Sequence, residues 1–88
     1  MIHTAEVEVT SRSGLHARPA ANLARLAARV DSAVALRSEG KVVNAASVLA
    51  LITANIGEGQ VVTVECTGDN SEADLAEIVS AIRSGLGD

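Results

Sequence analysis

Aromatic side chains are missing from this chain of 88 residues, which contains no Phe, Tyr or Trp. Because 48% of the residues are nevertheless hydrophobic, we expect a core built from Val, Leu, Ile and Ala. Basic residues are also few, 7 against 11 acidic ones, which gives a formal net charge of −4. Single-stranded nucleic acid needs aromatic stacking platforms and nucleic-acid phosphates need clustered Lys and Arg, so we expect no nucleic-acid partner.

Cysteine is nearly absent as well. Cys66 is the only one, which excludes an internal disulfide and any paired-cysteine redox or metal site. No cluster of His, Cys and carboxylates has metal-ligand spacing, so we expect neither a metal nor a cofactor. A metallochaperone of ferredoxin-like shape is set aside, because its first loop would need paired cysteines.

Targeting and membrane segments are missing too. Residues 1–10 carry Glu6 and Glu8 and lack the basic start and apolar stretch of a signal peptide. No hydrophobic run approaches the length of a membrane span. We therefore expect a cytoplasmic protein without direct membrane insertion, folded as a single domain over residues 1–88 because the chain is too short for two.

Strands are indicated in three parts of the chain. Alternating polar and apolar residues predict strands at residues 4–10 and 60–67. Short apolar stretches on both sides of residues 38–41 predict a hairpin, in which Gly40 accepts a positive φ at the turn.

Helical spacing of apolar residues predicts helices at residues 17–29, at 47–54 and from about residue 71 to just before Gly85. The solvent face of the third helix is expected to carry its acids, which are Glu72, Asp74 and Glu77. The resulting order is β-α-β-β-α-β-α. Amphipathic helices and half-polar strands bury their apolar sides together when the helices cover one face of a sheet, which predicts an open-faced two-layer α/β (α+β) sandwich.

Residues 14–20 read GLHARPA and lie where a loop meets the first predicted helix. With His16 near the cap, Pro19 falls in the first turn, where its missing N–H costs little. Ala17 and Arg18 keep free backbone N–H groups, because the first amides of a helix have no partner within it. These amides, the helix dipole and the Arg18 guanidinium converge near the imidazole. The pattern predicts an anion site around a nucleophile, as phosphorylation of His16 requires.

In these residues the chain resembles the HPr family, the histidine-containing phosphocarriers of the bacterial phosphoenolpyruvate-dependent sugar phosphotransferase system. The family's active-site motif is similar to GLHARPA, and residues 44–49, which read NAASVL, match the family's serine segment in placement. The resemblance covers essentially the whole chain. It implies a four-stranded antiparallel sheet of order 1-4-2-3 with three helices on one face.

The resemblance also implies a function. His16 would be phosphorylated on Nδ1 by enzyme I, using phosphoenolpyruvate, and would pass the phosphoryl group to the IIA domains of sugar permeases. Arg18 matches the family's active-site arginine, which stabilises phosphate charge. The chain would be a monomeric carrier and not an enzyme, because partner enzymes supply the rest of the chemistry.

The second predicted helix carries two further expectations. Ser47 is a favoured N-cap residue, and loss of such a cap costs roughly 1 kcal/mol. The resemblance implies that Ser47 is also a regulatory serine, phosphorylated by an HPr kinase/phosphorylase. So short a helix cannot turn all its apolar residues inward. Aligned to the family, Leu51 takes the buried place, and the partner-facing places are those of Val48, Leu49 and Ile52.

Three positions depart from the family pattern. Ala46 stands where many relatives have lysine, Asn55 replaces a usual glycine, and Glu58 sits where lysine is common. These changes bear on partner identity and kinase recognition, so a carrier of the nitrogen branch or of a dihydroxyacetone system stays open. An alternative from another class is an α/β regulatory interaction module that never carries phosphate. The histidine at position 16 counts against that alternative.

Overall fold

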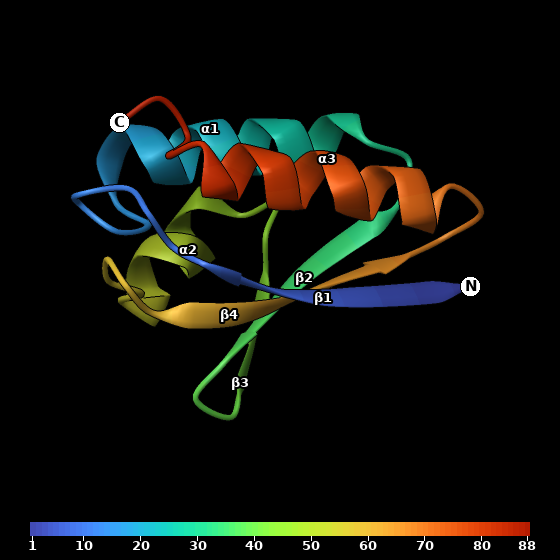
Figure 1. Cartoon of the computed structure of the whole chain (residues 1–88), viewed down its shortest axis with the longest axis horizontal. Coiled ribbons are helices and arrows are strands. Elements are labelled where there is room, and N and C mark those ends of the chain that lie inside the picture. Colours follow the sequence, from blue (N-terminus) through green and yellow to red (C-terminus); the bar gives the residue numbers. More distant parts are fainter.

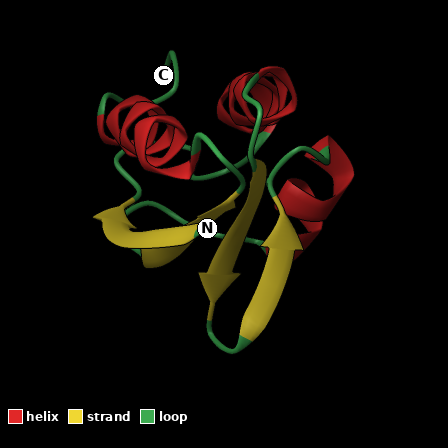
Figure 2. Cartoon of the chain, turned by 90° about the vertical axis from the view of Figure 1, so that its right-hand side faces the viewer, coloured by secondary structure: helices red, strands yellow, loops and turns green.

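The computed structural model describes residues 1–88 and contains seven elements in the predicted order. They are β1 (Ile2–Glu8), α1 (Ala17–Arg29), β2 (Ala33–Ser38), β3 (Lys41–Asn44), α2 (Val48–Ala54), β4 (Val61–Thr67) and α3 (Ser71–Arg83). The strands form one antiparallel sheet in the order β1-β4-β2-β3. Figure 1 shows the long helices α1 and α3 above the sheet, and Figure 2 shows all three helices on one face of it. The predicted open-faced sandwich and its strand order are confirmed.

The core lies between the sheet and the helices and is entirely aliphatic apart from Cys66. Its 21 buried apolar residues form one contiguous cluster, which joins the inner face of every strand to all three helices. Val62, Val64 and Cys66 point inward from β4, as the alternation predicts. None of the helices has the length and hydrophobicity needed to cross a membrane.

The first strand is placed two residues earlier than the predicted range of 4–10. It begins at Ile2, which pairs with Thr67, and ends at Glu8. Thr10 leaves the sheet because its hydroxyl donates to the carbonyl oxygens of Ile82 and Arg83, at 3.1 Å and 3.0 Å, at the end of α3. The bonds that end the strand join residues separated by 72 and 73 positions in the chain. Local alternation of polar and apolar residues cannot reveal such distant contacts.

The hairpin between β2 and β3 turns at Glu39 and Gly40, which have φ values of 50° and 78°. Positive φ at both central residues is the requirement of a type I′ turn, whose twist matches that of the strands. The prediction for Gly40 is confirmed. Glu39 also adopts the left-handed region, although this conformation costs less free energy for glycine than for other residues.

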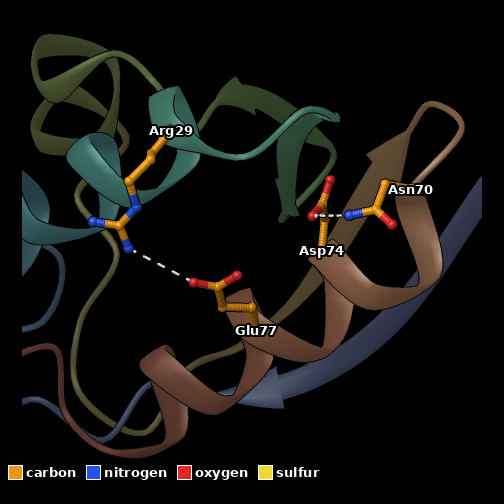
Figure 3. A network of polar contacts seen from close by, with 4 residues as sticks. All are labelled: Arg29, Asn70, Asp74 and Glu77. Carbon is orange, nitrogen blue, oxygen red and sulfur yellow. Dashed lines mark hydrogen bonds and ion pairs between the residues drawn. The ribbon is translucent and has the colours of Figure 1, made fainter.

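Asp74 is buried, so its predicted place on the solvent face of α3 is wrong. Its side chain is 4% exposed, and Oδ2 accepts hydrogen bonds from the Ser32 hydroxyl at 2.6 Å and the Ser32 N–H at 2.9 Å. Oδ1 accepts a third bond from Asn70 Nδ2 at 2.9 Å (Figure 3). The carboxylate thus joins the first turn of α3 to the loop between α1 and β2. These bonds, above all the one from the Ser32 hydroxyl, lower the pKa of Asp74.

The other two acids of α3, Glu72 and Glu77, are exposed as predicted. Glu77 faces Arg29 of α1 at 3.6 Å, and both side chains remain largely in solvent (Figure 3). Exposed ion pairs of this kind contribute little to stability. The hydrogen-bonded carboxylate of Asp74 is therefore the polar contact of α3 with the larger structural consequence.

We expect Asp74→Asn to destabilise the protein in a pH-dependent way. A carboxyl with a lowered folded pKa stabilises the fold above about pH 4, and this contribution disappears as the pH falls through the folded pKa. The free energies of unfolding of the variant and the wild type should therefore differ at pH 7 and converge in acid. Urea denaturation at a series of pH values measures this. Glu72→Gln serves as the exposed control, and a difference for Asp74→Asn that is constant with pH would contradict the assignment.

Candidate functional site

His16 lies immediately before α1 and takes the N-cap position, with φ −126° and ψ 164°. The helical hydrogen bonds start from the Ala20 N–H to the His16 carbonyl oxygen, at 3.4 Å. The N–H groups of Ala17 and Arg18 precede this first bond and have no carbonyl one turn earlier. The imidazole itself forms no cap bond to its helix. The structure therefore places His16 at the amino-terminal end of α1, next to the residues whose amides are free.

A backbone contact from a distant loop holds this helix start. The Leu15 N–H donates to the Ile56 carbonyl oxygen at 2.9 Å, and both of these side chains are completely buried. Gly14 has a φ of 68°, and a Cβ at that position would collide with the same carbonyl oxygen. The close approach of the two segments therefore requires glycine at position 14.

The imidazole of His16 meets the end of α2. Its Nε2 lies 3.4 Å from Oδ1 of Asn55, and Nδ1 has no hydrogen-bond partner. Asn55 ends α2 in the left-handed region, at φ 56° and ψ 48°. In the sequence, Asn55 stands out only as a departure from the family pattern, and its place beside His16 is hidden because the two residues are 39 positions apart.

Ala17, the residue after the histidine, has a φ of 50°. A left-handed conformation costs a residue other than glycine about 1–3 kcal/mol, and such positions cluster at functional sites. Alanine carries no sequence signal for this conformation, so the strain could not be predicted. It is stored directly beside the imidazole.

Arg18 is exposed and takes part in no ion pair, and α1 has no acidic residue in its first turn. The carboxylate of Asp88, at the end of the chain, accepts bonds from the N–H and the hydroxyl of Ser13, at 3.1 Å and 3.3 Å, and not from Arg18. The guanidinium is thus free to approach an anion at the helix start. No three His, Cys, Asp or Glu side chains gather where they could hold a metal ion.

The second helix has the exposure pattern expected for it. Ser47 is the N-cap, and its hydroxyl accepts a bond from the Ala50 N–H at 3.1 Å. Leu51 is fully buried, whereas three apolar side chains are exposed, at 40% for Val48, 76% for Leu49 and 37% for Ile52. We call these three residues the α2 apolar patch. The helix packs against α1, and its C-cap contacts His16, so the patch and the histidine lie at one end of the molecule.

This fold and this site are those of a small phosphoryl carrier, and comparison with known proteins identifies the family. The model of the family described as PTS HPr component phosphorylation site matches residues 3–84. Phosphocarrier protein NPr of Escherichia coli (strain K12) is 40% identical over 81 residues, covering 91% of this chain and 90% of the relative. Phosphocarrier protein HPr of Vibrio cholerae serotype O1 is 33% identical over 75 residues, covering 85% and 88%.

Solved structures agree with these relatives. The crystal structure of HPr-C-His from Thermoanaerobacter tengcongensis superimposes with a TM-score of 0.92 at 30% identity, covering 98% of this chain and 97% of the other. The chain belongs to the HPr family of phosphocarrier proteins. Members of this family are carriers and not catalysts, as the sequence predicts.

We expect Gly14→Ala to lower the free energy of unfolding more than Gly40→Ala does. Both glycines have positive φ, so both substitutions cost roughly 1–2 kcal/mol for the backbone conformation. Only at Gly14 does the new methyl group meet a backbone atom, whereas nothing lies within 4 Å at Gly40. Urea denaturation of the two variants measures the difference. Equal losses would contradict a close approach between Gly14 and Ile56.

Proposed function

We propose that this protein accepts a phosphoryl group on Nδ1 of His16 from a phosphoenolpyruvate-dependent enzyme I and passes it to a IIA domain. One observation carries the proposal: the imidazole is fixed at the open start of α1 with Nε2 beside Asn55 and Nδ1 unpartnered. A ring nitrogen with a free lone pair is the nucleophile that attack on phosphorus needs. The same nitrogen must later release the phosphoryl group to the acceptor.

The surroundings of His16 suit a phosphoryl group. The amides of Ala17 and Arg18 and the helix dipole supply positive potential, and the Arg18 guanidinium supplies a full charge. Phosphoryl transfer requires chiefly positioning and neutralisation of charge. A carrier can therefore leave the remaining catalytic groups to its partner enzymes.

The α2 apolar patch is the surface we propose for docking these partners. The helix that carries it packs against α1 and ends at Asn55, which contacts His16, so a partner that covers the patch brings its own reactive group toward the imidazole. Arg18 and Arg25 of α1 are exposed and form no ion pair, so their charges are open to an acidic partner. We propose further that the protein works as a monomer in the cytoplasm and meets enzyme I and IIA domains there in turn.

Incubation with enzyme I and phosphoenolpyruvate that carries radioactive phosphorus should label the protein with an acid-labile, base-stable group. His16→Ala should abolish the label, and His3→Ala, at the only other histidine, should keep it. Arg18→Gln should slow labelling roughly 10-fold or more, because one charge-assisted contact to the phosphoryl group is lost. Absence of label on the wild type would refute the proposal and favour an interaction module that carries no phosphate.

We expect Leu49→Asp to slow labelling by enzyme I about 5-fold or more, since a charge in the centre of an apolar contact must be desolvated. Val61→Asp is the matched control, because Val61 is also exposed, at 55%, but lies on the open face of the sheet. Both rates come from the same labelling assay. Equal slowing by the two substitutions would exclude the α2 apolar patch as the docking surface.

A second candidate is the nitrogen branch of the phosphotransferase system in place of the sugar branch. The NPr relative is more similar, at 40% identity, than the HPr relative, at 33%. Ala46 and Glu58 are exposed at positions where many relatives have lysine, which changes the charge that an acceptor meets. The two candidates differ in the IIA protein to which the labelled carrier gives up its phosphoryl group.

Ser47 remains a proposed site of regulatory phosphorylation by an HPr kinase/phosphorylase. Its hydroxyl is half-buried and engaged with the Ala50 N–H, so modification exchanges the cap bond for contacts made by phosphate oxygens at the same helix end. A phosphate there would place negative charge directly beside Val48 and Leu49. Such a charge would oppose docking of partners on the α2 apolar patch.

A further inference from the structure

We propose that Asn55 is a positioning residue for His16: its side-chain oxygen accepts the Nε2–H of the neutral imidazole and thereby keeps the lone pair on Nδ1. The inference deepens the proposed function and rests on it for its consequence, since the ring nitrogen that keeps its lone pair is the one able to accept a phosphoryl group. The tautomer itself is a property of the unphosphorylated protein. It can therefore be measured whether or not phosphorylation occurs.

The contact that carries the inference is the only hydrogen bond of the ring. Nε2 of His16 lies 3.4 Å from Oδ1 of Asn55, and Nδ1 has no partner. In a neutral imidazole one nitrogen donates and the other accepts, and the partner of one nitrogen decides the role of the other. An oxygen beside Nε2 can only accept, so it favours the proton on Nε2 and the lone pair on Nδ1.

The backbone holds both partners of this contact in place. On one side, the Asn55 N–H donates to the Ile52 carbonyl oxygen at 3.1 Å, and the left-handed conformation of Asn55 ends α2. On the other side, the Leu15 N–H is bonded to the carbonyl oxygen of Ile56, the residue after Asn55. The residues adjoining the contact are thus tied together directly. Little freedom remains beyond the side-chain torsions of His16 and Asn55.

The residue type at position 55 supports a role for its side chain. A left-handed helix end is usually occupied by glycine, and asparagine is the next most favoured residue. Glycine would satisfy the backbone equally well, so the backbone alone does not require the carboxamide. Asn55 meets the conformational demand and adds a hydrogen-bond acceptor that reaches the imidazole.

The consequence is a phosphoryl transfer that moves no proton on the ring. The Nδ1 lone pair forms the nitrogen–phosphorus bond while the bond from phosphorus to the donor breaks, and its electron pair leaves with the donor. Nε2 keeps its proton throughout and remains bonded to Asn55. Onward transfer reverses these two bond changes and returns the lone pair to Nδ1.

The test measures the tautomer of His16 in ¹⁵N-labelled, unphosphorylated protein by long-range ¹H–¹⁵N NMR, at a pH where the ring is neutral. The wild type should hold the proton on Nε2. Asn55→Gly, which keeps the left-handed backbone, should raise the ratio of Nδ1–H to Nε2–H about twofold or more, because a hydrogen bond to Nε2–H is lost. Asn55→Asp, which retains an acceptor, should restore the wild-type tautomer.

Thr53→Ala, an exposed change on the same helix, is the matched control and should leave the ratio unchanged. An unchanged ratio in Asn55→Gly, or a wild type with its proton on Nδ1, would overturn the proposal. The rate of labelling by enzyme I provides the second readout, and it should fall in Asn55→Gly but not in Thr53→Ala. If the wild type is never labelled, the proposed function fails, and the NMR result still decides the role of Asn55.

Discussion

One backbone hydrogen bond, from the Leu15 N–H to the Ile56 carbonyl oxygen, supports the functional end of this molecule. Both residues are completely buried, so water does not compete for the bond, and losing one partner would leave the other unsatisfied in the core. The bond joins the loop before α1 to the loop after α2. His16 and Asn55 adjoin its two ends, which is why residues so distant in sequence meet there.

The rest of the fold makes this contact possible. An aliphatic core holds the helices on one face of the sheet, and α2 packs against both α1 and β3. Gly14 allows the loops to approach, and Ala17 adopts a strained conformation as the chain enters α1. A carrier has two requirements that oppose each other, an exposed nucleophile and a fixed one. Burying Leu15 before His16 and Ile56 after Asn55, while leaving the His16 ring partly exposed, meets both.

Much of this arrangement could be predicted from local patterns. The bounds of α1 and the inward residues of β4 follow from periodicity, and the GLHARPA run indicates where the chemistry lies. The choice of Val48, Leu49 and Ile52 as the exposed apolar residues of α2 came from alignment to the HPr family. The strand order came from the resemblance to HPr proteins, because periodicity gives the faces of strands and not their neighbours. The errors share one cause. Asp74 is bonded to Ser32 from 42 positions away, and Asn55 contacts His16 from 39 positions away, so neither contact leaves a local signal.

The most direct test of this account is the exchange rate of the Leu15 amide hydrogen under native conditions. If the bond to Ile56 fixes the functional end of the molecule, this amide should exchange only through global unfolding, as slowly as the amides of the central strand β4. Exchange of Leu15 at the rate of an open loop, while β4 stays protected, would contradict the account, because the segment that carries His16 would then move independently of the segment that carries Asn55.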